Sequence, residues 1–524
     1  MTAEEMTRRE LNVVMAALAV TLLLAALDQT IVSTALPTMV GDLGGLNHYS
    51  WVVTAYMLTS TAGVPLFGKI SDLIGRKVVL QFAVVTFLVG SILAGLSQNM
   101  TQLIVTRGIQ GIGGGGLMAM SFVVMGDLIT PRERGKYAGY FTGVFAMASV
   151  IGPLVGGFLV DQLSWRWVFY VNMPIGVISL IALQRFLHMP KVRHERSIDW
   201  LGALFMVSGV SALLLVCVWG GQDYAWTSPV IIGLGVAAAV LGGLFVAQES
   251  RTPEPLLPLR LFRDPVIRVS TGLSFLLGMA MFGAMTFLPL FLQVVTGASP
   301  TTSGLLLLPM MGGVLTASTL SGRLTTRTGK YRIFPIVGTS LTIVGIVVLS
   351  RLDASSSRVH SSLGMLVLGF GIGMTMPTLT LAVQNAAPSA DLGVATSSVN
   401  FFRSLGGALG VAIFGAVMTA RVAASLASQH IDVRGQANLL GSPEAIRGIT
   451  DPHTRTGVID ALAAGVHGVF VFAIPVVLLA FVVSWLLKEL PLRTTLGSVS
   501  MVDGAGEAAE VLDDELPEPV PAHR

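Results

Sequence analysis

The sequence predicts an all-α protein that crosses a membrane fourteen times. Of its 524 residues, 53% are hydrophobic and only 12% are charged, whereas a soluble globular protein carries about 25% charged residues. A chain of this length with so few charges cannot cover its surface with them, so a soluble globular protein is excluded. The apolar residues also occur in repeated blocks of about 20, the length that spans a bilayer as a helix.

Fourteen apolar blocks are the expected transmembrane helices. The first follows a short charged head, residues 1–11, and is too long for a signal peptide, so we interpret it as a retained helix. The blocks cover residues 12–34, 50–67, 78–97, 101–124, 137–160, 167–187, 199–219, 229–248, 269–293, 303–321, 333–350, 361–383, 395–420 and 466–487. Membrane helices tolerate glycine and proline, because neighbouring helices cover the backbone groups that these residues expose. The 59 glycines and 24 prolines therefore do not argue against these spans.

The basic residues predict the orientation. If both termini are cytoplasmic, the inner loops and termini carry 23 of the 32 Lys and Arg residues, as the positive-inside rule requires. An odd number of spans would destroy this alternation, so the charge bias also favours fourteen. The segment 422–465 then becomes an extracytoplasmic loop, and the acidic tail 491–524 is expected to be disordered in the cytoplasm.

One short charged loop occurs twice in the chain. The segment 68–77 follows the second span and the segment 322–330 follows the tenth, with Thr326 at the position of Asp72. Internal repeats of this kind are typical of secondary transporters. The eight spans between the copies fit a six-helix repeat plus two inserted helices. We therefore expect six-helix bundles at residues 12–187 and 266–490, with an inserted pair and its linkers at 188–265.

Further motifs occur in order along the chain. They lie at residues 27–37, 107–111, 152–157, 165–176, 199–202 and 398–410. Together with the loop 68–77, they resemble the major facilitator superfamily, and in particular its fourteen-helix drug:proton antiporter branch. The resemblance covers about residues 10–490. It implies the major facilitator fold and proton-coupled multidrug efflux across a bacterial cytoplasmic membrane.

Asp28 is the candidate proton carrier. It is the only carboxylate well inside an assigned span, where an acid costs about 2.5–3.5 kcal/mol at the helix centre. Burial favours the neutral form of a carboxyl group, so Asp28 could take a proton from one side and release it on the other. The alternative is a helix-packing acid paired with Arg107 or with a backbone amide. The resemblance implies that Arg107 assists proton transfer, and a purely structural anchor is the alternative for that residue.

The repeated loop supplies the candidate gating residues. They are Gly68, Asp72, Gly75, Arg76 and Lys77. The two glycines permit a tight turn, and pairing of the acid with a base or a helix end would hold one access state closed. Alternatively, the two basic residues only enforce topology.

Span five contains the candidate antiporter motif. It consists of Gly152, Pro153, Gly156 and Gly157, with Ala148 at a position where glycine is usual in the family. Small residues predict close helix packing, and proline removes one backbone donor. That this packing produces exporter behaviour is implied by the resemblance alone.

A polyspecific substrate site would be a roomy apolar cavity between the two bundles, where methionine adapts its shape. The candidate cavity residues are Gln29, Met118, Met147, Phe275, Met279, Phe282 and Met310. The sequence contains no recognisable hydrolase triad, phosphate loop or metal cluster, and its single cysteine, Cys217, excludes an internal disulfide.

These patterns predict a transporter and not an enzyme. We expect no metal or other cofactor, no nucleic-acid partner, and a functional monomer surrounded by membrane lipids. Its partners would be protons and small hydrophobic or amphiphilic substrates, including cationic drugs. The alternative is a dedicated exporter of one metabolite, such as a self-made antibiotic, a siderophore or a lipid, with the same proton coupling.

Overall fold

The computed structural model describes most of the chain. The described residues are 8–44, 48–128, 131–187, 199–220, 224–252, 255–352, 356, 358–388, 391–431, 446, 449 and 451–491. Within them, fourteen helices have at least fifteen residues, and there is no β-strand. Eleven described helices are long and apolar enough to cross a membrane. The predicted all-α, fourteen-helix architecture is confirmed.

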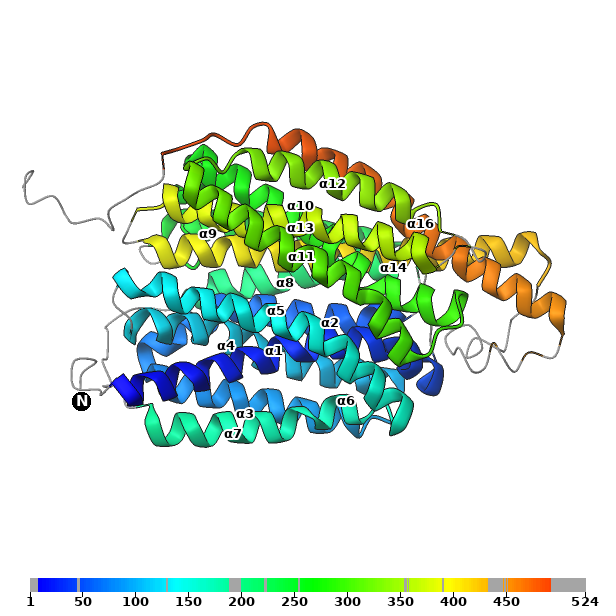
Figure 1. Ribbon diagram of the computed structural model, residues 1–524, viewed down its shortest axis with the longest axis horizontal. Helices are drawn as coiled ribbons and strands as arrows, with labels where there is room; N and C mark the ends of the chain where they lie inside the picture. Colours follow the sequence, from blue (N-terminus) through cyan, green and yellow to red (C-terminus); the bar gives the residue numbers. More distant parts are fainter. Residues whose placement is uncertain are drawn as a thin grey trace, which may run out of the picture.

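The helices lie side by side along one axis (Figure 1). In chain order they are α1 (Arg8–Leu43), α2 (Tyr49–Ile74), α3 (Arg76–Gly95), α4 (Met100–Leu128), α5 (Pro131–Gln162), α6 (Trp167–Tyr170), α7 (Asn172–Phe186), α8 (Trp200–Trp219), α9 (Pro229–Arg251), η3 (Leu259–Arg263), α10 (Pro265–Leu290), η4 (Phe291–Val295), α11 (Pro300–Thr328), α12 (Ile333–Leu349), α13 (Arg358–Ala386), α14 (Leu392–Ser428) and α16 (Pro452–Ser484).

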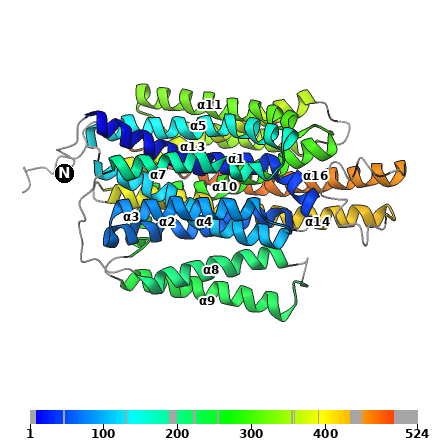
Figure 2. The same cartoon turned by 90° about the horizontal axis from the view of Figure 1, so that it is seen from below.

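The long helices form two groups, with one pair outside them. In the N-half, α1 packs against α4, α5 and α7, while α2 and α3 pack on α4. In the C-half, α10 packs against α13, α14 and α16, while α11 and α12 pack on α13. The helices α8 and α9 pair with each other, and α8 contacts both α2 and α14 (Figure 2). The inserted pair therefore covers the seam at which α2 meets α14.

The first and last described residues lie at the same end of the bundle (Figure 1). We call this the terminal end. The opposite end, which includes Gly44 at the end of α1 and the turn at residues 296–299, is the far end. An even number of long helices requires this arrangement.

Glycines let α4 approach its neighbours closely. A Cβ atom on Gly111 would lie 2.4 Å from the carbonyl oxygen of Tyr56 in α2, and one on Gly113 would lie 2.4 Å from the backbone nitrogen of Phe87 in α3. A side chain at either position would separate the helices. The glycine-rich run 111–116 superficially fits a dinucleotide-binding pattern, but that pattern requires a preceding strand, and here it lies inside a helix.

Two helices continue into the segment that the sequence predicts as a loop. In the range 422–465, α14 extends to Ser428 and α16 begins at Pro452. Val422, Leu426, Val458 and Leu462 are at most 5% exposed and belong to one apolar cluster. Hydropathy ends a predicted span at the first polar residues, whereas packing between two amphipathic helices extends them further. Residues 432–445, the linker 188–198 and the tail 492–524 lie outside the described residues.

Candidate functional site

Asp28 lies in α1 with no exposed surface. Its carboxylate accepts three side-chain hydrogen bonds: from Arg107 Nη1 to Oδ2 at 2.7 Å, from Gln110 Nε2 to Oδ1 at 2.7 Å, and from Asn172 Nδ2 to Oδ1 at 2.9 Å. The donors belong to α4 and α7. A buried charge is tolerated when it is paired and hydrogen-bonded, so this shell suits an ionised carboxylate.

Arg107 has partners besides this carboxylate. Its side chain is 2% exposed, and it donates to Gln110 Oε1 at 2.5 Å and to the backbone oxygen of Val52 at 3.4 Å. Its guanidinium carbon lies 4.3 Å from the ring centroid of Tyr56 and 5.9 Å from that of Phe169. Cation–π contacts in a desolvated site are worth about 2 kcal/mol. The cation therefore keeps stabilising contacts when the carboxylate is neutralised.

Three polar residues of this network were not assigned a role from the sequence. Gln110 and Asn172 lie in the motifs at 107–111 and 165–176, and Ser91 in α3 accepts from them at 2.8 and 3.3 Å. All three are completely buried. A large polar side chain inside a predicted span is itself a signal, because it must find a partner there.

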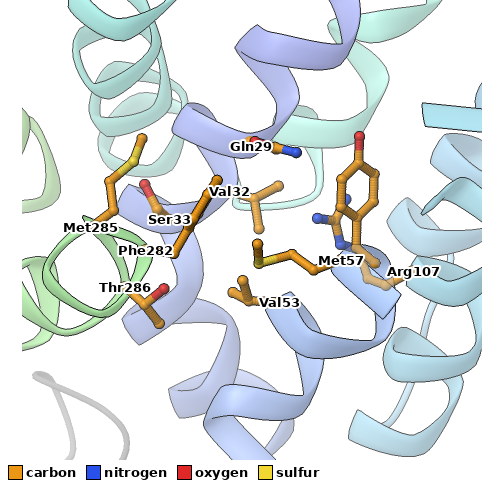
Figure 3. A pocket seen from close by; sticks show the side chains of 10 residues that line it. Gln29, Val32, Ser33, Val53, Met57, Arg107, Phe282, Met285 and Thr286 are labelled. Carbon is orange, nitrogen blue, oxygen red and sulfur yellow. The ribbon is translucent and has the colours of Figure 1, made fainter. Parts of the chain in front are cut away.

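A small pocket lies beside Arg107, between α1 and α2 of the N-half and α10 of the C-half (Figure 3). Its lining consists of Gln29, Val32, Ser33, Val53, Tyr56, Met57, Arg107, Phe282, Met285 and Thr286. Its cavity volume is about 20 Å³, which is room for about one water molecule. Ligand pockets usually measure about 300–1,000 Å³, so this conformation is contracted around the pocket.

Two of the seven predicted cavity residues, Gln29 and Phe282, line this pocket. The other five lie outside its lining. Met279 and Met310 are buried within the C-half, and Met147 is 43% exposed. Met118 and Phe275 pack against an apolar cluster that contains Tyr56 and Met57.

The predicted antiporter motif packs α5 against α1. A Cβ atom on Gly152 would lie 1.9 Å from Thr30 Oγ1, and one on Gly156 would lie 2.8 Å from the carbonyl oxygen of Ile31. The Thr30 hydroxyl also donates to the carbonyl oxygen of Ala148 at 3.1 Å. Both α1 positions follow Asp28 by less than one helical turn, so the motif packs directly beside the acid-bearing part of α1.

The same motif also contacts the C-half. A Cβ atom on Gly157 would lie 2.5 Å from the Cα atom of Thr301 in α11, and one on Gly304 would lie 2.3 Å from the carbonyl oxygen of Pro153. The backbone N–H of Thr301 donates to Asp161 Oδ2 at 2.9 Å. The two halves therefore touch backbone to backbone at the far end.

Two further hydrogen bonds join the halves toward the far end. Tyr49 Oη donates to the carbonyl oxygen of Thr286 at 2.8 Å, and Gln293 Nε2 donates to that of Thr34 at 2.7 Å. At the terminal end, by contrast, the ion pair Arg260–Asp391, at 2.8 Å, joins η3 to the start of α14 and does not involve the N-half. In the described part of the chain, the hydrogen bonds between the two halves given above therefore lie toward the far end.

The predicted gating loop 68–77 is mostly helical: residues 68–74 are the last turns of α2, residues 76–77 begin α3, and only Gly75 lies between the two helices. Hydropathy ended the second span at the first polar residues, whereas the helix continues to Ile74. Gly75 has φ +102°, a conformation that favours glycine. Arg76 Nη1 donates to the carbonyl oxygen of Gly68 at 3.4 Å and to the hydroxyl of Ser71. The cation thus lies over the carboxyl end of α2, where the helix dipole favours positive charge. The side chain of Asp72 lies outside the described residues, and its pairing stays a prediction.

Lys77 also binds a helix end. Its Nζ donates to the carbonyl oxygen of Gln184, in the last turn of α7, at 2.8 Å. In the second copy of the loop, Gly329 has φ +71° and ends α11. Both copies therefore use a glycine to stop a long helix at the terminal end.

The fold and this site define a helical membrane transporter, in which two halves meet around a pocket beside a buried charge pair. The chain belongs to the Major Facilitator Superfamily, which matches residues 18–411. An MFS-type transporter of Mycobacterium tuberculosis is 41% identical over 92% of this chain and 70% of its own. The multidrug transporter protein MdtP of Bacillus subtilis is 39% identical over 91% and 92%, and multidrug resistance protein 3 of the same species is 35% identical over 90% and 94%.

Solved structures support the same fold. A bacterial homologue of the human lysosomal transporter Spinster, in an inward-facing and unoccupied conformation, has a TM-score of 0.66 at 14% identity, covering 94% of this chain and 100% of that one. An auto-inhibited POT family peptide transporter has a TM-score of 0.64 at 13% identity, covering 93% and 99%. The family resemblance inferred from the motifs, with its multidrug efflux type, is confirmed.

Proposed function

We propose that this transporter is a proton-coupled antiporter that exports hydrophobic, often cationic, drugs across a bacterial cytoplasmic membrane. The observation that carries the proposal is the completely buried Asp28–Arg107 ion pair, 2.7 Å apart, beside a pocket lined by both halves. The two multidrug relatives named above support drugs as the substrate class. Asp28 is the proton site in this proposal, and Arg107 is the fixed cation next to it.

The electrostatics favour exchange of a proton for a cation. While Asp28 is ionised, the pair is neutral, so a cationic drug can enter the pocket. Protonation of Asp28 leaves Arg107 uncompensated on the pocket wall. A drug cation about 6 Å from it would be repelled by about 3 kcal/mol at an effective dielectric constant of about 20, roughly a hundredfold in affinity. Proton and drug therefore exclude each other, as antiport requires.

Alternating access then follows from movement of the two halves. In the conformation described above, the halves touch through Gly157 and Gly304 at the far end, and the pocket is too small for a drug. To release a drug at the far end, α5 must separate from α11, while the terminal end closes. In the same proposal, the loop 68–77 acts in terminal-end gating.

The orientation is part of the proposal. Basic residues are concentrated in the loops at the terminal end of the bundle, so the positive-inside rule assigns that end to the cytoplasm. Both termini are then cytoplasmic, and the far end faces outward. Protons driven inward by the membrane potential, worth about 2.3 kcal/mol per charge per 100 mV, would supply the energy.

The test is uptake of a fluorescent cationic drug into energised inverted membrane vesicles. The native chain should accumulate the drug, and a protonophore should abolish accumulation. Asp28→Asn should behave like the native chain with protonophore, because an amide cannot release a proton. The matched control is Asp42→Asn, the same change on the same helix at a half-exposed carboxylate, which should keep accumulation.

Undiminished accumulation by Asp28→Asn would remove Asp28 from the coupling role. Accumulation that survives the protonophore would remove proton coupling itself. A panel of chemically unrelated drugs and lipids addresses the alternative of a dedicated exporter, because that protein would accumulate only one of them.

A further inference from the structure

The hydrogen bonds around Asp28 suit only its ionised form. Among the described residues, three side chains hydrogen-bond to the carboxylate, and each of them donates an N–H group to it. A neutral carboxyl group carries an O–H donor and needs an acceptor. An antiporter that protonates this acid must therefore supply an acceptor, and one of the surrounding side chains has to change its role.

The side-chain amide of Gln110 cannot reverse its orientation. Its Oε1 accepts from Arg107 at 2.5 Å, and its Nε2 donates to Asp28 and, at 2.8 Å, to Ser91. Rotation of this amide by half a turn would place its NH₂ group against the guanidinium, donor against donor. Both ends of the Gln110 amide are thus held by the present arrangement.

The side-chain amide of Asn172, by contrast, is hydrogen-bonded at its NH₂ end only, among the described residues. Its Nδ2 donates to Asp28 at 2.9 Å and more weakly to Ser91 at 3.3 Å. Its Oδ1 is buried and has no hydrogen-bond partner in the part of the chain that the structure describes. A buried unpaired acceptor is costly, and half a turn about the Cβ–Cγ bond would bring that oxygen to Asp28. The turn would break the Nδ2 bond to Asp28, which a neutral acid no longer needs, and the longer bond to Ser91.

We propose that Asn172 is a positioning residue that follows the protonation state of Asp28. It donates through Nδ2 to the ionised carboxylate and accepts through Oδ1 from the neutral acid. The inference rests on the proposed proton coupling at Asp28. The charged or titratable groups facing that site are Arg107 from α4 and Tyr56 from α2, whereas the partners from α3 and α7 do not titrate.

The location of Asn172 gives this rotation a structural consequence. It is the first residue of α7, directly after the turn at Val171 that separates α6 from α7. The hydrogen bonds that its side-chain amide donates connect α7 to α1 through Asp28 and to α3 through Ser91. Proton binding would therefore change the contact of three N-half helices at one point.

Isotope-edited infrared spectroscopy of the native chain in lipid vesicles tests the inference. The side-chain amide carbons of asparagine are labelled with carbon-13, and the Asn172 band is identified by its loss in Asn172→Leu. Titration of Asp28 is followed by its neutral carboxyl band, identified by its loss in Asp28→Asn. The Asn172 carbonyl band should move to lower frequency as the carboxyl band appears, because its oxygen gains a donor.

Gln110 is the internal control, with labelled glutamine in place of asparagine. Its carbonyl stays on Arg107 in both states, so its band should not follow the titration. A second measurement, the pH profile of drug efflux, should shift by about one pH unit in Asn172→Leu. Asn172→Gln, which restores an amide, should recover part of that shift.

The outcomes separate the two proposals. If the Asp28 carboxyl band appears and the Asn172 band stays constant, the amide rotation is overturned and proton coupling stands. An equal movement of the Gln110 band would overturn the assignment to Asn172. If no Asp28 carboxyl band appears while the protein remains folded, the proton site fails, and this inference fails with it.

Discussion

Gly157→Ala tests whether the glycine contact between α5 and α11 holds the far end closed. The added Cβ atom would lie 2.5 Å from the Cα atom of Thr301 and 2.6 Å from the carbonyl oxygen of Pro300. Ordinary contacts of a Cβ atom begin near 3.4 Å, so the two helices must separate by about 1 Å. Overpacking of this kind costs about 1–3 kcal/mol. A state with α5 and α11 already apart avoids the cost.

The expected result is a shift toward the state open at the far end, about 5- to 150-fold at 1.36 kcal/mol per tenfold. The assay places one cysteine in the pocket, Ser33→Cys, in a Cys217→Ala background. A membrane-impermeant maleimide is applied from the extracytoplasmic side of intact cells. Ser33 lines the pocket and is 5% exposed, so its labelling rate reports far-end opening.

Gly143→Ala is the matched control, because it adds the same methyl group to the same helix with no atom within 4 Å. Its labelling rate should equal that of the parent. Gly304→Ala, whose Cβ atom would lie 2.3 Å from the carbonyl oxygen of Pro153, should act like Gly157→Ala. An unchanged rate in both interface variants, or an equal increase in Gly143→Ala, would refute the reasoning.

Three further predictions concern packing, substrate contact and pH. Gly113→Ala should lower the thermal unfolding temperature, because its Cβ atom would lie 2.4 Å from the α3 backbone, whereas Gly108→Ala, whose nearest neighbour is at 3.9 Å, should not. Phe282→Ala removes an aromatic wall of the pocket and should raise the KM for aromatic drugs about tenfold or more; an unchanged KM would place the drug elsewhere. The Thr454 hydroxyl and backbone N–H lower the pKa of Asp451 at the start of α16, so this capping stabilises the first turn above the unfolded-state pKa and is lost as pH falls through the folded-state pKa. Hydrogen-exchange protection of that turn should fall on acidification in the native chain and stay constant in Asp451→Asn.

The sequence allowed the prediction of elements whose signal is local. A run of about twenty apolar residues can satisfy all its own backbone hydrogen bonds in lipid only as a helix. The number of helices therefore followed from composition and spacing. Asp28 and Arg107 were recognisable because a charge in such a block is conspicuous. The ends of α14 and α16 were harder to predict, because these helices continue past the predicted spans through contacts such as those of Val422 in the apolar cluster.

The partners of Asp28 depend on helix rotation, which no single span encodes. Asn172 lies 144 residues from Asp28, and a rotation of α7 by half a turn would direct its amide into lipid. The pocket lining shows the same limitation. Gln29 and Phe282 were predicted from their residue types, but Met279 belongs to the same helix as Phe282 and is buried within the C-half, because only one face of α10 meets the N-half.

The chain by itself therefore determined the class of protein, the number of helices and the buried acid, because these depend on the free energy of placing each residue in lipid. The tertiary structure alone decided that three polar side chains donate to Asp28, that Asn172 is left with an unpaired acceptor among the described residues, and that glycines of α5 and α11 close the far end. Those features depend on how whole helices pack. The few charged residues inside the helices, such as Asp28 and Arg107, meet their partners only through that packing.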